Sequence, residues 1–163
     1  MRELTRDDAA FVLELLNDRD FIRFIGDRGV RTLEHSRDYI EQGPSRSYAD
    51  LGIGLLRMSL QSGAPVGLCG LLQRNFLPDP DLGFALLPAF RGTGLCHEAA
   101  RAVIDDPRAA QFDRISAIVQ PDNGASIALL GKLGFVFERR FRVAANEPEL
   151  LVYAMLRDRA SGN

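Results

Sequence analysis

A pair of glycines at a strand-to-helix junction is the feature of this sequence best suited to chemistry. Gly92 and Gly94 lie between an apolar stretch ending at Leu87 and a helical pattern beginning near Leu95. Glycine allows a sharp turn and lets a ligand approach the backbone without a Cβ clash. Because the first N–H groups of a helix lack partners and its dipole is positive there, this turn predicts a phosphate or pyrophosphate site. Arg91 could supply a charged partner.

Spacing excludes two other phosphate-binding motifs. A dinucleotide fingerprint starting at Gly92 requires a small residue at position 97, which is His97. A P-loop built on the Gly131-Lys132 pair would need glycine where Ser126 stands and a hydroxyl residue where Leu133 stands. Spacing alone leaves the Gly-x-Gly turn equally compatible with a tight packing turn that binds nothing.

The helices and strands that must position this turn can be predicted from the spacing of apolar residues and from the capping and turn residues between them. Apolar periodicity and caps predict helices over residues 5–17 (with a capping box from Thr5 to Asp8), 20–25, from 33 to a stop before Gly43-Pro44, 94–104, and 126–133 ending at Gly134. Apolar runs bounded by turn residues predict strands over 51–60, 65–74, 81–87, 114–119, 135–143 and 150–156, the first two forming a hairpin. This order predicts an α/β fold, a mixed central sheet with helices on both faces.

Composition bounds the class of protein. The 163 residues fit a single domain, and 46% apolar with 26% charged residues exclude a disordered chain. A net charge of −2 disfavours binding of nucleic acid by bulk charge. Cys69 and Cys96 lie in apolar segments without metal-ligand spacing, which predicts reduced thiols and no metal site. We see no signal peptide and no run of residues long enough to cross a membrane, so we expect a cytoplasmic protein without a membrane partner.

Three motifs in order resemble one family. Arg91-x-x-Gly94-x-Cys96 resembles the Gln/Arg-x-x-Gly-x-Gly/Ala pyrophosphate loop of the GNAT (Gcn5-related N-acetyltransferase) superfamily. The segment 121–126 with 129–135 looks like the N-x-A-S…L-x-K-L-G-F segment of its RimJ/RimL-like branch, and 81–88 resembles that branch's strand before the loop. The similarity runs from about Thr5 to Met155.

The resemblance implies a GNAT fold in which acetyl-CoA, used as co-substrate, lies in a V-shaped gap between splayed parallel strands 81–87 and 114–119. Backbone amides of the glycine turn would hold the pyrophosphate, and a strand backbone would pair with the pantetheine arm. Asn123 would bond near the pantetheine, and Ser126 would lie near the thioester sulfur. The implied cofactor-binding residues are Leu86, Leu87, Arg91, Gly92, Thr93, Gly94, Leu95, Cys96, Asn123 and Ser126.

The implied reaction is direct attack of a neutral amine on the thioester within a ternary complex. Asp81 aligns with an acidic residue of many relatives and is the leading general base, acting through a water, although a turn residue at a strand start explains it equally well. Ser126 is the candidate acid or sulfur-orienting group, with an ordinary first-turn serine as the alternative.

Three departures from the family pattern bear on these roles. Cys96 stands at the usual Gly/Ala position of the loop. Leu130 falls where several branches have a tyrosine that acts as general acid. Only Arg2-Glu3-Leu4 precede the first helix, so the first strand is expected to be stunted, with its sheet edge exposed or covered by a partner. A homodimer is left open.

We therefore expect acetyl transfer to a primary amine, either a protein N-terminal α-amino group or a small-molecule amine. Arg28 and Arg31 lie where the family builds its acceptor cleft, and either an acidic peptide or no ligand fits them. One alternative is a detoxifying acetyltransferase for aminoglycosides or polyamines, against which these arginines argue. The other is a non-catalytic acyl-CoA-binding module, which the missing tyrosine leaves open.

Overall fold

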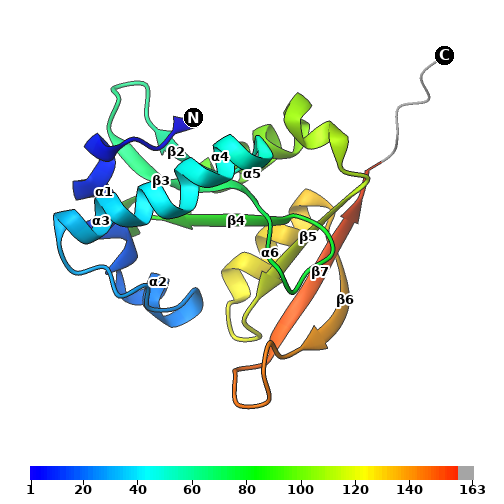
Figure 1. Ribbon diagram of the computed structural model, residues 1–163. Coiled ribbons are helices and arrows are strands. Elements are labelled where there is room, and N and C mark those ends of the chain that lie inside the picture. Colours follow the sequence, from blue (N-terminus) through cyan, green and yellow to red (C-terminus); the bar gives the residue numbers. More distant parts are fainter. Residues whose placement is uncertain (158–163) are drawn as a thin grey trace.

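A mixed sheet forms the centre of the computed structural model, which describes residues 1–157 (Figure 1). Its seven strands within these residues run in the order β1-β2-β3-β4-β5-β7-β6. Neighbouring strands are antiparallel except β4 and β5, which are parallel, so the predicted mixed sheet is confirmed. The strands are β1 (Arg2–Glu3), β2 (Leu55–Ser59), β3 (Pro65–Leu72), β4 (Asp81–Leu86), β5 (Arg114–Val119), β6 (Val136–Phe141) and β7 (Leu150–Leu156).

Helices cover both faces of the sheet, as predicted. The helices are α1 (Ala9–Leu16), α2 (Arg19–Phe24), α3 (Leu33–Ile40), α4 (Arg46–Leu51), α5 (Leu95–Asp105) and α6 (Gly124–Leu133). Val12 of α1 and Ile40 of α3 pack with Leu68 of the sheet in one apolar cluster. Val103 of α5 and Leu130 of α6 belong to a second cluster with sheet residues. Burying an apolar side on each face fixes β4 and β5 between two layers of helix.

The third helix does not stop before Gly43-Pro44, and this prediction is wrong. A π-helical turn, η2 (Glu41–Ser45), carries α3 into α4, with Pro44 buried inside it. The widened hydrogen-bond spacing of a π turn accommodates a residue that has no N–H to donate. As a result, the strand predicted from residue 51 begins only at Leu55, after Gly52 has ended α4 in the left-handed conformation (φ +68°).

The first strand is stunted, as expected, and a buried carboxylate secures it. β1 pairs with β2, Arg2 opposite Arg57. Asp8, 4% exposed, accepts hydrogen bonds from Arg2 (2.7 Å), Arg57 (2.8 Å) and the Thr5 backbone N–H (2.9 Å). Burial raises the pKa of Asp8, but these bonds outweigh it and the net pKa is lowered. An ionised Asp8 therefore joins β1, β2 and the turn that starts α1.

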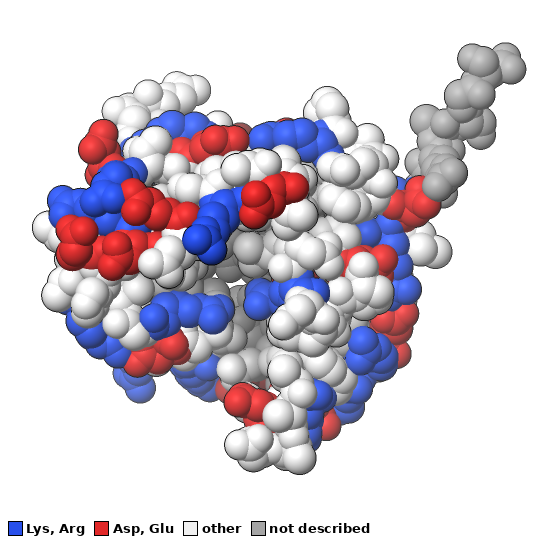
Figure 2. All heavy atoms as spheres, viewed as in Figure 1, with Lys and Arg blue, Asp and Glu red and all other residues white. Residues whose placement is uncertain are grey.

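β4 and β5 separate along their length, which confirms the expected splayed pair. Within residues 1–157 a single ladder pair joins them, Asp81 opposite Ser116, and the Ser116 N–H donates to the Pro80 carbonyl at 2.9 Å. By contrast, the β3–β4 ladder continues to Leu86. The two strands therefore touch where β4 begins and part toward their carboxyl ends. Figure 2 shows the molecule hollowed below β4, with Lys and Arg side chains bordering the hollow.

Candidate functional site

The glycine turn follows β4 after a short 3-10 helix, η3 (Pro88–Phe90), and begins α5 with free donors. Gly92 and Gly94 have φ of +73° and +87°, values that side chains rarely adopt, and Gly94 is the N-cap of α5. The first helical hydrogen bond runs from Glu98 N–H to the Gly94 carbonyl at 3.1 Å, so the N–H groups of Leu95 and Cys96 precede the helical ladder. The turn itself is exposed. Its chemistry is that of an anion site at the positive end of a helix.

Arg91 does not project freely beside this turn. Its guanidinium pairs with Asp18 and, at 2.6 Å, with Asp20, and it donates to the Leu86 carbonyl from Nε (3.2 Å) and Nη2 (3.1 Å). Asp18 also caps α2, accepting from the N–H groups of Asp20 and Phe21. Burial raises the pKa of Asp18, but the bonds from Arg91 and the cap lower it overall. Arg91 therefore connects α2 to the end of β4.

Backbone groups of β4 face the gap at alternate residues. Leu87 donates to the Val66 carbonyl (2.9 Å) and accepts from Phe90 N–H (3.0 Å), so both its backbone groups are bonded within the protein. Because pairing in an antiparallel ladder alternates, Leu86 and Phe84 point their N–H and C=O away from β3, toward β5. Phe84 was not among the residues expected from the sequence. The orientation of its backbone groups follows from the register of β4 against β3, which residue spacing in the sequence does not indicate.

Asp81 lies at the joined end of the two strands, almost completely enclosed. It is 1% exposed, and its Oδ1 is 2.8 Å from Arg74 Nε. Burial raises the pKa of Asp81, while the charge and hydrogen bond of Arg74 oppose the rise. A raised pKa brings a carboxylate toward the range useful for a general base. Its enclosure leaves no surface for direct contact with an incoming amine.

Asn123 and Ser126 lie beyond the other end of the gap. Asn123 is the N-cap of α6, and its Oδ1 accepts from Ser126 N–H at 3.1 Å. Among residues 1–157, neither the Asn123 amide nitrogen nor the Ser126 hydroxyl makes a further hydrogen bond, so both remain available to a ligand. Since they follow the carboxyl end of β5, they share an edge of the sheet with the turn after β4. No hydrogen bond joins Ser126 to Asp81 within the described chain.

The two cysteines are free, and both pack against apolar neighbours. Cys69 is buried and Cys96 half-buried. Burial raises the pKa of Cys96 to about 12, which favours the protonated thiol at neutral pH. Leu130, at the position where other branches have a tyrosine, is 1% exposed in the core.

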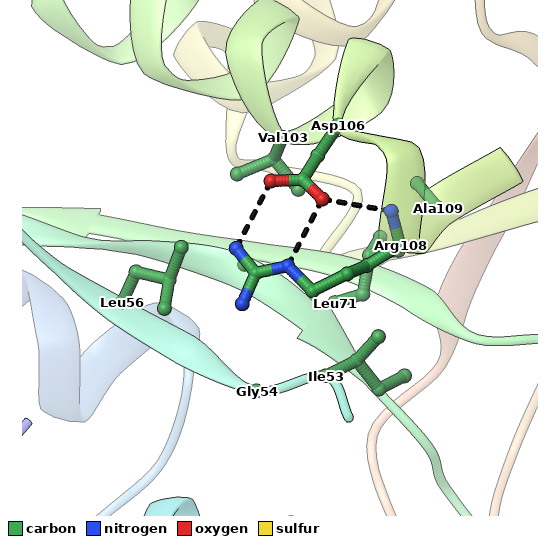
Figure 3. A pocket seen from close by; sticks show the side chains of 9 residues that line it. Ile53, Gly54, Leu56, Leu71, Val103, Asp106, Arg108 and Ala109 are labelled. Atoms are coloured by element: carbon green, nitrogen blue, oxygen red, sulfur yellow. Dashed lines mark hydrogen bonds and ion pairs between the residues drawn. The ribbon is translucent and has the colours of Figure 1, made fainter. Parts of the chain in front are cut away.

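Two hollows lie outside the gap between β4 and β5. One, of about 550 Å³, is lined by the α2–α3 loop and α3, including Arg28 and Tyr39. The other, of about 20 Å³, lies between β2, β3 and the end of α5 and is bordered by the Asp106–Arg108 ion pair (Figure 3). The second has room for about one water molecule and cannot hold a substrate.

Searches of residues 1–157 for two other features were negative. They contain no cluster of three or more His, Cys, Asp or Glu residues placed to hold a metal ion. The same part of the chain forms no helix with the length and apolarity needed to span a bilayer.

Comparison with known proteins agrees with this geometry. The family model described as an acetyltransferase (GNAT) domain matches residues 1–136. The uncharacterized protein YkkB of Bacillus subtilis is 26% identical over 141 residues, 84% of this chain and 80% of YkkB.

Two solved structures share the fold. RimL, a ribosomal L7/L12 alpha-N-protein acetyltransferase in complex with coenzyme A, superposes with a TM-score of 0.82 at 15% identity, covering 97% of this chain and 93% of RimL. Spermidine N-acetyltransferase of Vibrio cholerae, in complex with CoA and spermine, gives 0.77 at 17% identity, covering 97% and 95%. With the splayed strands, the glycine turn and the family match together, the chain belongs to the GNAT family of N-acetyltransferases.

Proposed function

We propose that this protein transfers the acetyl group of acetyl-CoA to a primary amine, with the cofactor in the gap between β4 and β5. The observation that carries the proposal is the single β4–β5 ladder pair, which leaves the backbone groups of Phe84 and the N–H of Leu86 facing β5 without a ladder partner, while Arg91 covers the Leu86 carbonyl. An amide-containing pantetheine arm suits such a strand edge. The turn Gly92–Cys96 at the end of β4 suits the pyrophosphate.

The remaining cofactor contacts are proposed from the same arrangement. Asn123 offers its amide nitrogen and Ser126 its hydroxyl from the first turn of α6. Arg91 and Thr93 flank the pyrophosphate turn, with Arg91 exchanging its present partners for the anion. We propose Phe84 in place of Leu87 for backbone pairing, since Leu87 has both groups bonded to the protein.

In the proposed reaction the neutral amine attacks the thioester carbonyl and coenzyme A leaves as a thiol. Asp81 accepts the amine's proton through a water, because the carboxylate is too enclosed for direct contact. We propose Ser126 as a contact of the cofactor arm, because it lies at the open end of the gap with the pyrophosphate turn, whereas the acyl end is proposed near Asp81. The proposed reaction uses no cysteine nucleophile, since the raised pKa of Cys96 favours its protonated thiol at neutral pH.

An α-amino group is the acceptor that requires the least assistance with deprotonation at this site. Its pKa is roughly 7.7–8.0, whereas that of a lysine-like amine is about 10.4, so far more of it is neutral at pH 7. A protein N-terminus and a small α-amino compound both meet this requirement. We further propose one catalytic domain over residues 1–163, of which the last six lie outside the described residues.

Thermal unfolding with and without acetyl-CoA tests the cofactor site. Acetyl-CoA is expected to raise the Tm of the parent protein, and Gly94→Glu should abolish the shift by placing a carboxylate at the anion site. Gly63→Glu is the matched control, because Gly63 has the same φ of +87° and, like Gly94, open space around it, but lies in the β2–β3 hairpin. No shift in the parent, or equal loss in both variants, would refute the site. Thiol release on adding an amine then tests transfer.

A further inference from the structure

One hollow outside the gap between β4 and β5 is lined in part by charged and polar side chains. The loop between α2 and α3, together with α3 and the start of η2, borders an open surface hollow of about 550 Å³. Arg28, His35, Asp38 and Tyr39 line it.

Two arginines near this hollow, Arg28 and Arg74, have guanidinium N–H groups that make no hydrogen bond within the described residues. Arg28 makes no hydrogen bond or ion pair within residues 1–157. Arg74 gives Nε to Asp81, so both of its Nη groups stay free of partners in the described chain. Both arginines act on the same phenol: burial raises the pKa of Tyr39, and the charges of Arg28 and Arg74 oppose the rise. Arg31, by contrast, is fully engaged with Asp27 and Asn17.

The path of the proposed cofactor ends near these arginines. If the pyrophosphate binds at the turn after β4, the arm runs back along β4 toward Asp81. Six residues of strand span about 20 Å, which brings the acyl end toward the joined end of the strands. Arg74, held there by Asp81, then lies near the thioester, and its charge also acts on Tyr39 in the lining of the hollow. This step rests on the proposed function.

We infer that the acceptor is an amine that carries a carboxylate a few bonds from its nitrogen, with Arg28 and Arg74 binding that carboxylate. The Arg28 guanidinium and the two Nη groups that Arg74 does not give to Asp81 can form charge-assisted bonds with an anion, and both positive charges repel a polycation. Asp38 in the same hollow supplies a counter-charge for the entering ammonium group. An acidic amino acid and a peptide beginning with Asp or Glu share this chemistry, whereas spermidine and aminoglycosides lack it.

A panel of acceptors with saturating acetyl-CoA tests the inference by thiol release. Its arms are free aspartate and glutamate, C-terminally amidated peptides that begin with Asp or Glu, the same peptides beginning with Lys or Arg, and spermidine. Acidic acceptors are expected to exceed cationic ones by at least about tenfold in kcat/KM. The two acidic arms distinguish a free amino acid from a peptide terminus. Preference for spermidine or for the basic peptides would overturn the inference.

Charge reversal at Arg28 supplies the matched test. Arg28→Glu is expected to raise KM for acidic acceptors about tenfold or more and to leave the acetyl-CoA-induced Tm shift intact. Arg31→Gln, a neighbour whose charge is already neutralised by Asp27, should change neither quantity. An unchanged KM in Arg28→Glu contradicts the inference.

If no acceptor in the panel turns over, calorimetry on the CoA-saturated protein decides. Glutamate or the acidic peptide is then expected to bind the parent and to bind Arg28→Glu more weakly, and absence of binding overturns the inference. Failure of the proposed function appears separately, as loss of the acetyl-CoA shift in the parent protein.

Discussion

At Asp81, burial and an arginine partner act on the pKa in opposite directions. Asp81 is among the most enclosed side chains of the protein, yet it keeps an arginine partner at 2.8 Å. Burial raises its pKa, and Arg74 limits the rise. The balance leaves a carboxyl group that titrates above its ordinary range, at the point where the proposed cofactor's acyl end arrives.

Asp81→Asn is expected to lower kcat/KM by about 10²-fold or more, because the amide cannot accept a proton. The Kd for acetyl-CoA should stay unchanged. Asp79→Asn is the control, since Asp79 lies in the loop just before β4 and pairs with Arg114 rather than with Arg74. Steady-state kinetics and a cofactor titration measure the two quantities. Unchanged turnover would remove Asp81 from the mechanism.

The pH profile provides a second check on Asp81. A base must be ionised to act, and the raised pKa moves its titration upward from the ordinary value near 3.9. The pH–rate profile should therefore show an acid limb whose apparent pKa lies above that ordinary value. A second limb from ionisation of the amine substrate can accompany it. Asp81→Asn should lose the first limb while keeping the limb of the amine. A limb that persists in the variant belongs to another group.

At the scale of elements, Arg91 connects the start of α2 to the segment that follows β4. Its guanidinium reaches Asp18 and Asp20 at the start of α2 and also covers the Leu86 carbonyl. That carbonyl is one of the groups that the pantetheine arm would use. Arrival of the arm and the pyrophosphate therefore competes with the contacts that hold α2.

Arg91→Ala is expected to loosen α2, because the variant loses charge-assisted bonds worth about 1.5–3 kcal/mol each at best. Hydrogen exchange should become faster in residues 19–24, and acetyl-CoA should bind about tenfold more weakly. Arg19→Ala removes an exposed arginine from the same helix and serves as the control. Equal exchange of α2 in both variants would show that Arg91 does not support this helix.

The carboxylate at Asp8 links three elements and predicts an acid-labile contact. Its pKa is depressed, so its contribution to stability is present above the unfolded value near 3.9 and is lost as the pH falls through the folded value. Asp8→Asn should lower the free energy of unfolding by about 3 kcal/mol at pH 7, and the difference should shrink below pH 4. Urea titrations at both pH values measure this. Asp7→Asn, an exposed neighbour, should have little effect.

Element boundaries could be predicted from the sequence wherever local chemistry set them. β5 and β7 have the predicted bounds, since apolar runs flanked by turn residues are local signals. The turn at Gly92 and Gly94 was predicted for the same reason. The continuation of α3 through Pro44 was not, because proline usually ends a helix and a π turn leaves no sequence mark. Nor were the Arg91 ion pairs or the gap-facing Phe84, which depend on packing between distant segments.

For the whole molecule, the close approach of the backbone at Gly70 to that at Gly54 limits which side chains the sheet can accommodate there. A Cβ added at Gly70 would lie 2.0 Å from the Gly54 carbonyl oxygen, in the small hollow of Figure 3, whereas one at Gly131 meets nothing within 4 Å. Gly70→Ala is expected to destabilise the protein by about 3 kcal/mol or more, since the clash is with backbone. Gly131→Ala in α6 should instead stabilise it by up to about 1 kcal/mol. Thermal unfolding of the pair checks both signs.

Within the described residues one ladder pair near Asp81 joins the two halves of the sheet, and at the opposite end two contacts link α2 to the turn after β5. Arg23 pairs with Asp122 at 2.7 Å and its carbonyl accepts from Gln120 at 3.0 Å. A molecule that lies along β4, as proposed for the cofactor, would complete this seam and add about 2.7 kcal/mol at a hundredfold excess over its Kd. The resistance of the purified protein to proteolysis would then increase with the concentration of acetyl-CoA. The enzyme would therefore persist longest under conditions in which its co-substrate is abundant.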